Sequence, residues 1–435
     1  MPNRQTVKVW KSTQLSPDWF NRGKGAQEAD SAAVEKTVKE VISAVRERGD
    51  AAIIEFTEKF DKTKLNPKEM RVSAKEIEAA YKLVTKEQVT ALKLVREKLE
   101  AIEAVTLLQQ PAKTLREGIT VQTQMRPLES VGCYVPGGQA VYPSTLVMTA
   151  TPAKVAGVPR IVVCSPPTEK GNINPLILVA ADICGVDEIY KVGGVQAIAA
   201  LAYGTESIKP VRKIVGPGNK YVTAAKVLVS QDAAIDMPAG PSEVLVLADE
   251  SANPKLIAAE MVSQAEHGAD SVAGLITTSA KLADEVQGWL AKLYDAAERK
   301  EIVQQSLSKY GFIITCKEHD ELATLANVFS PEHLEIITQK PAEIAEKINT
   351  AGLILLGQFS PVALSDYASG TDHVLPTGGF GRTFSGLSVL DFTRRVSIVE
   401  SSKEGLKKVK PTIKVLTEAE RLPNHYKAVE ARFEK

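Results

Sequence analysis

The chain has 435 residues, of which 44% are hydrophobic and 24% are charged, and its 53 basic side chains balance its 53 acidic ones. This length predicts roughly two to four domains, each large enough to bury its own core. The composition argues against long disordered or low-complexity regions. A formal net charge of zero gives no overall electrostatic attraction to nucleic acid or to an anionic membrane.

The first residues, MPNRQTVKVWK, lack the apolar segment of a secretion signal, and no apolar run approaches the roughly 20 residues that span a bilayer. The cysteines are scattered and form no CxxC pair. We therefore expect a protein of the reducing cytoplasm, with no membrane and no nucleic-acid partner.

Residues 31–110 are predicted to be helical. Apolar residues from Val34 to Val45 recur at the helical period, and Thr85 with Gln88 resembles a capping box that opens a second, long helix. This N-terminal arm holds few residues suited to catalysis. We interpret it as a scaffold or as a contact between subunits.

From residue 131 onwards, short apolar runs alternate with glycine-rich turns and alanine-rich helical stretches, which predicts βαβ units and a parallel sheet. The turn Gly216-Pro217-Gly218 departs from the GxGxxG fingerprint, yet it can present backbone N–H groups to a phosphate at the start of a helix. Ligands of open α/β sheets bind at such strand ends. The expected strands are 131–135, 160–164, 187–192 and 211–215, and the expected helices are 145–156, 174–184, 195–203 and 219–230.

The alternation resumes after Pro241 and predicts a second α/β domain. Residues 376–395 are rich in Gly, Ser and Thr and are expected to form a loop. The tail from about residue 396 is expected to form a short strand and two helices. The expected strands of the second domain are 243–248, 271–277, 311–316, 333–337 and 352–356, and its expected helices are 254–267, 279–296, 318–328 and 341–350.

Gln264 and His267 stand three positions apart in the last turn of the predicted helix 254–267, so their side chains are expected on one face, within reach of a shared ion. The negative end of the helix dipole favours a cation there. A hydrogen-bonded surface pair is the alternative interpretation. His319, at a charged helix start, is expected to be a solvated surface residue.

Glu332 and His333 follow a proline in SPEHLEI and lead into a predicted strand. One rigid turn would thus carry a histidine suited to deprotonate an alcohol and a carboxylate suited to activate water. An exposed polar turn without a role is an equal alternative on spacing alone.

The segment SDYASGTDHVLPTGG, residues 365–379, is the densest in ligand-type side chains, with Asp366, Asp372 and His373 beside hydroxyl and glycine residues. This density exceeds what a turn requires. Asx turns and a capping aspartate remain the structural alternative.

Seven segments, taken together and in order, resemble the histidinol dehydrogenase family. The likeness runs from about residue 30 to the C-terminus. It implies a homodimeric, zinc-containing enzyme of histidine synthesis that oxidises L-histidinol to L-histidine through L-histidinal with two NAD. The segments are GCYVPGG (132–138), KVGGVQAIAAL (191–201), GPGNKYVTAAK (216–226), IDMPAGPSEVLVLAD (235–249), SQAEHGADS (263–271), SPEHLEI (330–336) and DYASGTDHVLPTGG (366–379).

Matched residue by residue, the resemblance implies which residues act as catalytic bases, zinc ligands, substrate contacts and NAD contacts. In the implied mechanism, His333 takes the hydroxyl proton and Glu332 activates a water that attacks the aldehyde. The implied zinc ligands are Gln264, His267, Asp366 and His425, and the implied catalytic bases are Glu332 and His333. The implied substrate contacts are Ser242, Gln264, His267, His333, Asp366, His373, Glu420 and His425, and the implied NAD contacts are Tyr134, Gln196 and Asn219.

The expected fold is α/β, with two Rossmann-like, incomplete doubly wound domains, an N-terminal helical arm and a small C-terminal extension. The extension is implied to reach the active site of the partner subunit. The expected divisions are 1–130 for the arm and part of the first α/β domain, 131–242 for the NAD-binding domain, 243–380 for the domain with metal and catalytic residues, and 381–435 for the extension.

Two positions depart from the usual family pattern. Arg421 stands where the family usually has glycine, and Asp372 stands where many relatives carry asparagine. A charge on Asp372 near the substrate would raise the pKa of the neighbouring His373. The role of His425 rests on the resemblance alone, since it would otherwise be an unremarkable helix residue.

One other mechanism and two other functions are alternatives to this interpretation. Aldehyde oxidation can proceed through a thiohemiacetal, and Cys133 lies in a glycine-rich turn, although no histidine is its sequence neighbour. A relative that oxidises another polar alcohol, such as a sulfonated diol, conflicts with the carboxylate of Glu420, which suits a cationic substrate. A non-catalytic binding module would not need both Glu332 and His333.

Overall fold

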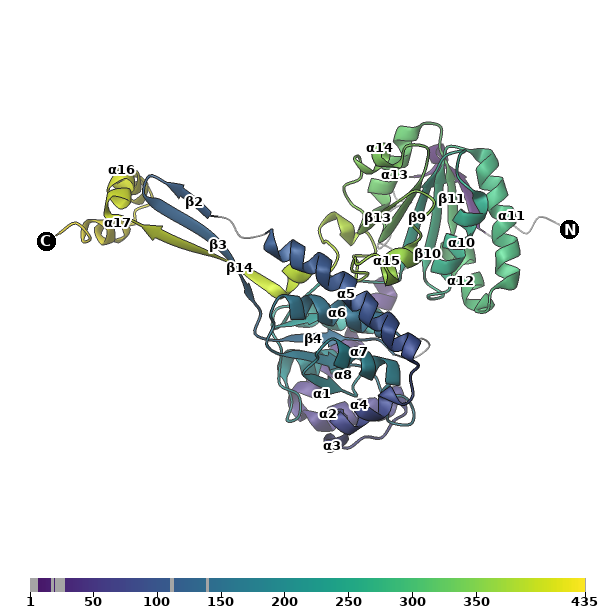
Figure 1. Cartoon of the computed structure of the whole chain (residues 1–435), viewed down its shortest axis with the longest axis horizontal. Coiled ribbons are helices and arrows are strands. Elements are labelled where there is room, and N and C mark those ends of the chain that lie inside the picture. The colour runs from purple at the N-terminus through teal and green to yellow at the C-terminus, as the bar shows by residue number, and fades with distance from the viewer. Residues whose placement is uncertain (1–6, 17–18, 20–27, 110–112, 138–140, 435) are drawn as a thin grey trace.

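The computed structural model describes residues 7–16, 19, 28–109, 113–137 and 141–434. Two parallel sheets covered by helices form the body of the molecule, and a third, antiparallel sheet with two helices projects from it (Figure 1). The α/β class predicted from the sequence is confirmed. None of the helices in the described ranges combines the length and the apolar character that crossing a membrane demands.

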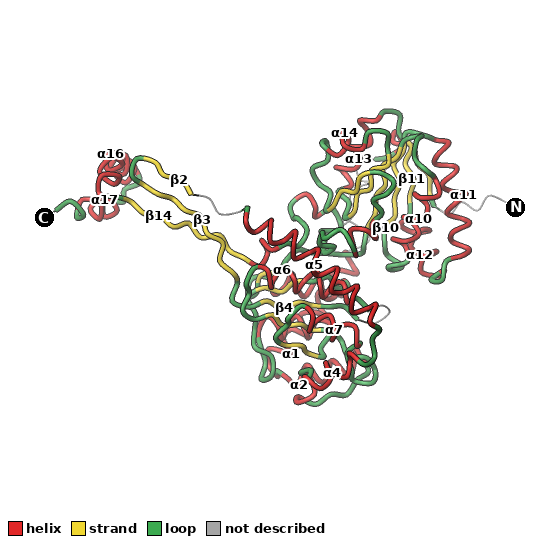
Figure 2. The backbone as a smooth tube through the Cα atoms, in the orientation of Figure 1, coloured by secondary structure: helices red, strands yellow, loops and turns green. Residues whose placement is uncertain are grey.

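The first domain, as we define it, is the five-stranded parallel sheet β6-β5-β4-β7-β8 with its helices. Because successive residues of a strand point to opposite faces, Ile161 and Val163 of β5 pack under one helical layer, and Val162 and Cys164 under the other. Figure 2 shows the helices on both sides of these strands. The strands are β4 (Val131–Tyr134), β5 (Ile161–Cys164), β6 (Glu188–Tyr190), β7 (Lys213–Val215) and β8 (Ala234–Ile235), and the helices between them are α6 (Pro143–Val155), α7 (Pro175–Ile183), α8 (Gly194–Tyr203) and α9 (Lys220–Val229).

The N-terminal helices complete both layers of this domain and do not form a free arm. α1 packs against α8 and α9, whereas α5 packs against α6 and α7. The predicted capping box is present, since the Thr85 hydroxyl accepts the Gln88 N–H at 3.2 Å. The helices are α1 (Glu28–Arg48), α2 (Asp50–Asp61), α3 (Pro67–Met70), α4 (Ala74–Tyr81) and α5 (Lys86–Leu108).

The second domain is the six-stranded parallel sheet β1-β11-β10-β9-β12-β13 with its helices. β9 lies at the centre and is buried along its whole length. Three of its elements were not predicted: the N-terminal strand β1, and helices α12 and α15. The strands are β1 (Lys8–Lys11), β9 (Glu243–Ala248), β10 (Val272–Thr277), β11 (Phe312–Thr315), β12 (His333–Ile337) and β13 (Leu353–Leu356), and the helices are α10 (Pro254–Ala265), α11 (Ala280–Ala296), α12 (Lys300–Tyr310), α13 (His319–Phe329), α14 (Pro341–Ala345) and α15 (Val362–Tyr367).

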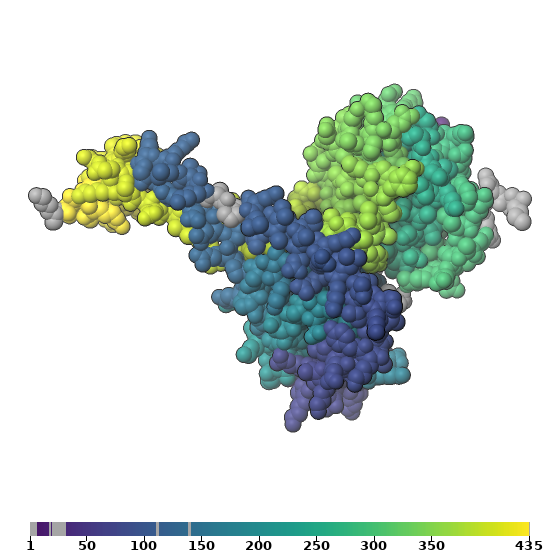
Figure 3. Space-filling view, viewed as in Figure 1, coloured from purple at the N-terminus to yellow at the C-terminus, as the bar shows by residue number. Residues whose placement is uncertain are grey.

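The C-terminal extension consists of the antiparallel sheet β14-β3-β2 and the helices α16 (Lys403–Ala419) and α17 (Pro423–Glu430). It stands clear of both domains in the space-filling view (Figure 3). β14 (Thr393–Ser401) begins inside the predicted loop 376–395, and β2 (Lys113–Arg116) and β3 (Ile119–Pro127) were not predicted. The physical reason is that these strands bury no full face in this chain, so they lack buried apolar runs, and the partial alternation of Ile119, Val121 and Met125 in β3 is a weak signal by itself.

Besides the N-terminal segment between β1 and α1, the chain joins the two domains at two neighbouring crossings. The first runs from β8 to β9, and the second follows α15. Beyond α15, Val374, Val389 and Phe392 pack into the core of the first domain. The Thr377 hydroxyl of the second crossing accepts the Gly240 N–H of the first, so the crossings are bonded to each other.

A buried ion pair fixes the carboxyl edge of the first sheet. Lys226 of α9 pairs with Asp236, which follows β8, and both side chains are almost fully buried. The Lys226 ammonium also donates to the Gly216 carbonyl at 2.8 Å, and the Asp236 carboxylate accepts the Gly216 N–H at 2.8 Å. The pair therefore holds the glycine-rich turn that follows β7.

Lys226→Met is expected to lower the free energy of unfolding by about 3–5 kcal/mol, because it leaves the Asp236 carboxylate buried without its counter-charge. Thermal unfolding at neutral pH measures this effect. Lys347→Met is the matched control, because it removes an ion pair with Asp320 whose two side chains are mostly exposed. Equal melting temperatures for the two variants would show that the buried pair does not hold this edge.

Candidate active site

β12 begins at His333, and this residue lies opposite Val244 of β9 in the parallel register. Both strands start at the same edge of the sheet, which places Glu332 and His333 beside Ser242 and Glu243. His333 and Glu332 are buried, with 4% and 6% of their surfaces exposed. The His333 Nδ1 atom lies 3.1 Å from the Glu243 carbonyl oxygen. A carbonyl only accepts, so in the neutral imidazole we assign the proton to Nδ1 and the lone pair to Nε2.

Two carboxylates flank the His333 ring. Glu332 Oε2 lies 3.5 Å from Nδ1, and Asp366 Oδ1 lies 3.5 Å from Nε2, so both contacts are ion pairs that are long for hydrogen bonds. Burial lowers the pKa of His333, but the charges of Glu332 and Asp366 outweigh it and raise the pKa to about 10. Without a competing cation, His333 is therefore held in its charged form.

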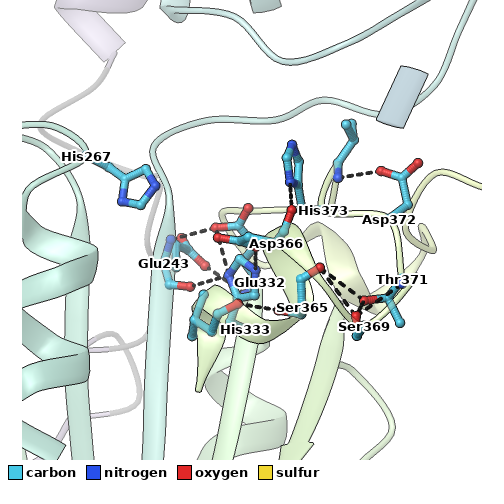
Figure 4. Close-up of polar contacts among 12 residues, drawn as sticks. Glu243, His267, Glu332, His333, Ser365, Asp366, Ser369, Thr371, Asp372 and His373 are labelled. Atoms are coloured by element: carbon cyan, nitrogen blue, oxygen red, sulfur yellow. Dashed lines mark hydrogen bonds and ion pairs between the residues drawn. The ribbon is translucent and has the colours of Figure 1, made fainter. Parts of the chain in front are cut away.

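Asp366 lies in the last turn of α15 and points toward the His333 ring (Figure 4). Burial raises the pKa of Asp366, but the close contact with His333 and the charge of its ring outweigh it and hold the pKa below its ordinary value. The neighbouring charges of His373 and His267 act in the same direction. Asp366 is thus an anionic oxygen donor among three imidazoles.

His373 joins the two domains at the site. Its Nδ1 atom lies 3.0 Å from the Asp366 carbonyl oxygen, and its Nε2 atom lies 3.3 Å from the hydroxyl of Thr145, in the first turn of α6. The expectation that Asp372 raises the pKa of His373 is wrong, because burial lowers this pKa and the charge that opposes burial most is that of Asp366. Asp372 instead accepts the Val374 N–H at 2.8 Å and points away from the ring (Figure 4).

Gln264 and His267 lie where α10 ends. The helix ends at Ala265, two residues earlier than predicted, so His267 lies just beyond it. Gln264 is 2% exposed, and its Nε2 atom has no hydrogen-bond partner among the described residues. His267 is exposed, lies 3.3 Å from the Ser263 carbonyl oxygen through Nδ1, and stands beside the cluster without touching it (Figure 4).

The three positions implied for the cofactor lie at the carboxyl edge of the first sheet. Tyr134 ends β4 and accepts the Gly194 N–H through its hydroxyl at 3.1 Å, and burial raises its pKa to about 12. Asn219 caps α9 by accepting two backbone N–H groups of its first turn. Gln196 is buried in α8, and neither of its amide atoms has a partner within the described part of the chain. This edge includes the switch point between β4 and β7.

Glu420 and His425 are not brought to this cluster within one chain. Both are exposed and lie at the end of α16 and in α17, far out on the extension (Figure 1). Arg421 between them has a φ angle of +57°, which is the left-handed region that glycine adopts without strain. This backbone geometry accounts for the glycine expected at that position.

Sequence reasoning missed two carboxyl groups beneath the site, the buried Glu335 and the half-buried Glu260. Glu335 lies two residues after His333 on the same face of β12, and Glu260 lies one turn before Gln264 in α10. Glu260 accepts the N–H of Val362, the first residue of α15, at 3.1 Å. Burial raises the pKa of Glu335 to about 9, and the charge of Glu260 adds to the effect. A glutamate inside the apolar strand HLEII was the available signal.

Two further observations bear on a cysteine nucleophile and on metal binding within one chain. Cys133 is fully buried, and burial raises its pKa to about 12, which makes its thiol a poor nucleophile. Across the described ranges, no three His, Cys, Asp or Glu side chains are arranged to hold a metal ion. Within one chain, the His267 imidazole is near enough for its charge to lower the pKa of Asp366, but no metal-binding set is assembled among the described residues.

Comparison with known proteins gives matches over almost the whole chain. A family model described as histidinol dehydrogenase matches residues 24–433. A histidinol dehydrogenase of Methanothermobacter thermautotrophicus is 46% identical over 399 residues, which cover 91% of this chain and 92% of that protein. One from Clostridium acetobutylicum is 45% identical over 415 residues, covering 95% and 96%. The crystal structure of histidinol dehydrogenase from Elizabethkingia anophelis aligns with a TM-score of 0.92 at 37% identity, covering 99% of this chain and 98% of that one.

The fold and these matches define an α/β oxidoreductase. The chain belongs to the histidinol dehydrogenase family. The resemblance noted in the sequence is thereby confirmed. The matches favour this family over the two alternatives, a dehydrogenase of another polar alcohol and a non-catalytic binding module.

The raised pKa of Glu335 predicts a pH-dependent stability. The unfolded chain releases this proton near pH 4.5, whereas the folded protein keeps it until about pH 9. Because the folded state binds the extra proton in this window, this group lowers the stability progressively as the pH rises from about 4.5 to 9. Glu335→Gln should therefore be stabilised relative to the parent at pH 8 by at least about 1 kcal/mol more than at pH 5.

Thermal unfolding at the two pH values measures this difference. Glu346→Gln, which changes an exposed glutamate of the same domain, is the control and should show no pH-dependent gain. The same gain at pH 5 and pH 8 would contradict a protonated Glu335.

Proposed function

We propose that this enzyme oxidises L-histidinol to L-histidine through L-histidinal, with zinc and two NAD, as a homodimer in the cytoplasm. One observation carries the proposal: the buried His333 has its Nδ1 atom against the Glu243 carbonyl and its Nε2 atom toward Asp366, with Glu332 adjacent in the chain. His333, a proton acceptor of fixed orientation, thus lies beside a second proton acceptor, the Glu332 carboxylate, at one edge of the sheet. Two successive oxidations require two such groups.

The residues present fit a zinc ion. Gln264 is buried, and its amide nitrogen has no hydrogen-bond partner among the residues that the structure describes. With Asp366 and the exposed imidazole of His267, it forms a nitrogen and oxygen donor set suited to zinc. When bound, zinc would supply positive charge beside Asp366, which opposes protonation of His333, and open positions for the two nitrogen donors of histidinol.

His333 and Glu332 divide the proton transfers between them. In the first oxidation the substrate hydroxyl gives its proton to His333 Nε2 while the carbinol hydride passes to NAD. Glu332 then holds a water and takes a proton from it as the water adds to the aldehyde. The hydrated aldehyde loses a second hydride to a second NAD and a proton to the same acceptors, which leaves the carboxylate. Both residues are buried, so the reactive aldehyde is shielded from bulk water.

The cofactor is proposed to bind at the carboxyl edge of the first sheet. The buried amide of Gln196, at the start of α8, has two polar atoms without a partner in the described part of the chain, which suits contact with a polar ligand. When bound there, NAD supplies the hydride acceptor. The contact between His373 and Thr145 joins this edge to the edge that carries His333, so cofactor and alcohol can meet.

The extension is proposed to complete the site of a second copy. Glu420 and His425 cannot serve the cluster of their own chain in this arrangement, while apolar side chains such as Val399, Val415 and Leu416 are exposed on the extension. Burying them against a partner is favourable. His425 would then be the fourth zinc ligand, and Glu420 a substrate contact, in the partner's site.

The yield of NADH tests the proposed reaction. Purified enzyme with zinc, excess NAD and limiting L-histidinol should give about two NADH per histidinol, because the aldehyde is oxidised in the same site. Absorbance at the NADH band measures the yield, and heat-denatured enzyme is the control. A yield of one NADH would contradict the second oxidation, and no NADH would contradict the proposed function.

Mixed dimers test the shared site. His267→Asn and His425→Asn chains should each be inactive alone, yet mixing them by refolding or co-expression should restore about a quarter of the parental activity. Half of the dimers formed at random are mixed, and each mixed dimer has one site with both histidines. Mixing His267→Asn with Asp366→Asn is the control. Both residues are supplied to a site by the same chain, so every site of a mixed dimer lacks one of them and no activity should return. No recovery in the first mixture would contradict a ligand supplied by the partner.

A further inference from the structure

Glu243 contacts both proposed bases through three separate groups. Its backbone N–H donates to Glu332 Oε2 at 2.7 Å, and its carboxylate Oε2 accepts the Glu332 N–H at 3.4 Å. Its carbonyl oxygen lies 3.1 Å from His333 Nδ1. Figure 4 shows the Glu243 and Glu332 side chains lying together beside the His333 ring. No other feature of the strand requires a charged residue here, because the rest of β9 is apolar and buried.

The same carboxylate also holds the second crossing between the domains. Glu243 Oε1 accepts the Gly378 N–H at 3.0 Å, and the neighbouring Thr377 hydroxyl accepts the Gly240 N–H. Gly378 has a φ angle of +63°, a conformation that most side chains resist. One buried carboxylate thus accepts two backbone N–H groups, one from the residue with the proposed water-activating role and one from the crossing.

We infer that Glu243 is a positioning residue of this enzyme, whose carboxylate fixes Glu332 against the crossing at Gly378 and whose carbonyl oxygen fixes the tautomer of His333. The inference rests on the proposed roles of Glu332 and His333. Glu243 itself touches neither the alcohol nor the cofactor in this assignment. It acts on the reaction by holding the carboxylate that must meet water.

The chemistry of the contacts predicts which step depends on the side chain. The bond to His333 uses a backbone carbonyl, which any residue at position 243 supplies. The contacts to Glu332 and Gly378 need two acceptor oxygens, and a glutamine has only one. In Glu243→Gln the amide NH2 must face one of the two N–H groups, so either Glu332 or the crossing shifts. The second oxidation, which uses Glu332, should therefore suffer more than the first.

The experiment compares two substrates on the full-length zinc enzyme. Rates with L-histidinol and with L-histidinal are measured separately under saturating NAD. Glu243→Gln should slow the oxidation of histidinal by about 10–100-fold, which is the cost of a catalytic group displaced by about 1 Å, and the first oxidation of histidinol by clearly less. Glu103→Gln is the matched control, because Glu103 is also buried and accepts a backbone N–H, from Val389 at 2.6 Å, without contacting either base.

The variant pair Glu243→Gln and Glu332→Gln separates a positioning role from general loss of stability. If Glu243 acts through Glu332, the double variant should oxidise histidinal less than about threefold more slowly than Glu332→Gln alone. If the two residues act independently, the rate reductions of the two single variants should multiply in the double variant. Glu243→Asp, which keeps the charge but shortens the reach, provides a second test if the glutamine variant does not fold. It should slow the same step.

The outcomes distinguish the water-activating role proposed for Glu332 from the positioning role inferred for Glu243. Equal slowing of both oxidations by Glu332→Gln would contradict the proposed water-activating role. If Glu332→Gln slows the second oxidation selectively while Glu243→Gln and Glu243→Asp both behave like Glu103→Gln, the inference about Glu243 is wrong and the proposed function stands. Multiplicative effects in the double variant would likewise overturn the positioning role.

Discussion

The candidate site depends on the parallel pairing of β9 with β12. Because His333 lies opposite Val244, the residues before them in the chain, Glu332 and Glu243, are neighbours and bond to each other through backbone and side chain. A shift of one residue in this register would turn His333 to the opposite face of the sheet. Apart from Glu335, the rest of both strands is apolar and buried, so the core fixes the register and the register fixes the geometry of the two proposed bases.

The two domains use opposite edges of their sheets. The residues implied for the cofactor lie at the carboxyl edge of the first sheet, as is usual in open α/β folds, whereas the proposed bases lie at the amino edge of the second. Hydride transfer needs the alcohol and the cofactor in direct contact. The bonded crossings and the contact of His373 with Thr145 hold the two edges together, which explains why a site can form between sheets that each bury a separate core.

Much of the fold was predictable from the sequence, because buried parallel strands are short apolar runs between glycine-rich turns, as at 131–135 and 243–248. The strands β2 and β3 were not, since they bury no full face in this chain. Glu332 and His333 stood out by their position after a proline, and their burial is now established. The role of Glu243 could not be foreseen, because it arises from a register between strands 90 positions apart. In the proposed dimer, the place of His425 depends on a second chain, which no pattern within one sequence reports.

The two carboxylates around His333 give the strongest reason to expect a bound cation at this site. Two carboxylates hold this buried imidazole in its charged form, which cannot accept a proton from an alcohol. The zinc ion that we propose at Asp366, Gln264 and His267 would oppose this charge and resolve the conflict. The most direct measurement is anomalous diffraction at the zinc edge from crystals of the zinc-loaded enzyme. The account predicts one strong peak per subunit, within bonding distance of Asp366 Oδ1 and of the side chains of Gln264 and His267. A peak bound by other residues, or none near Asp366, would contradict it.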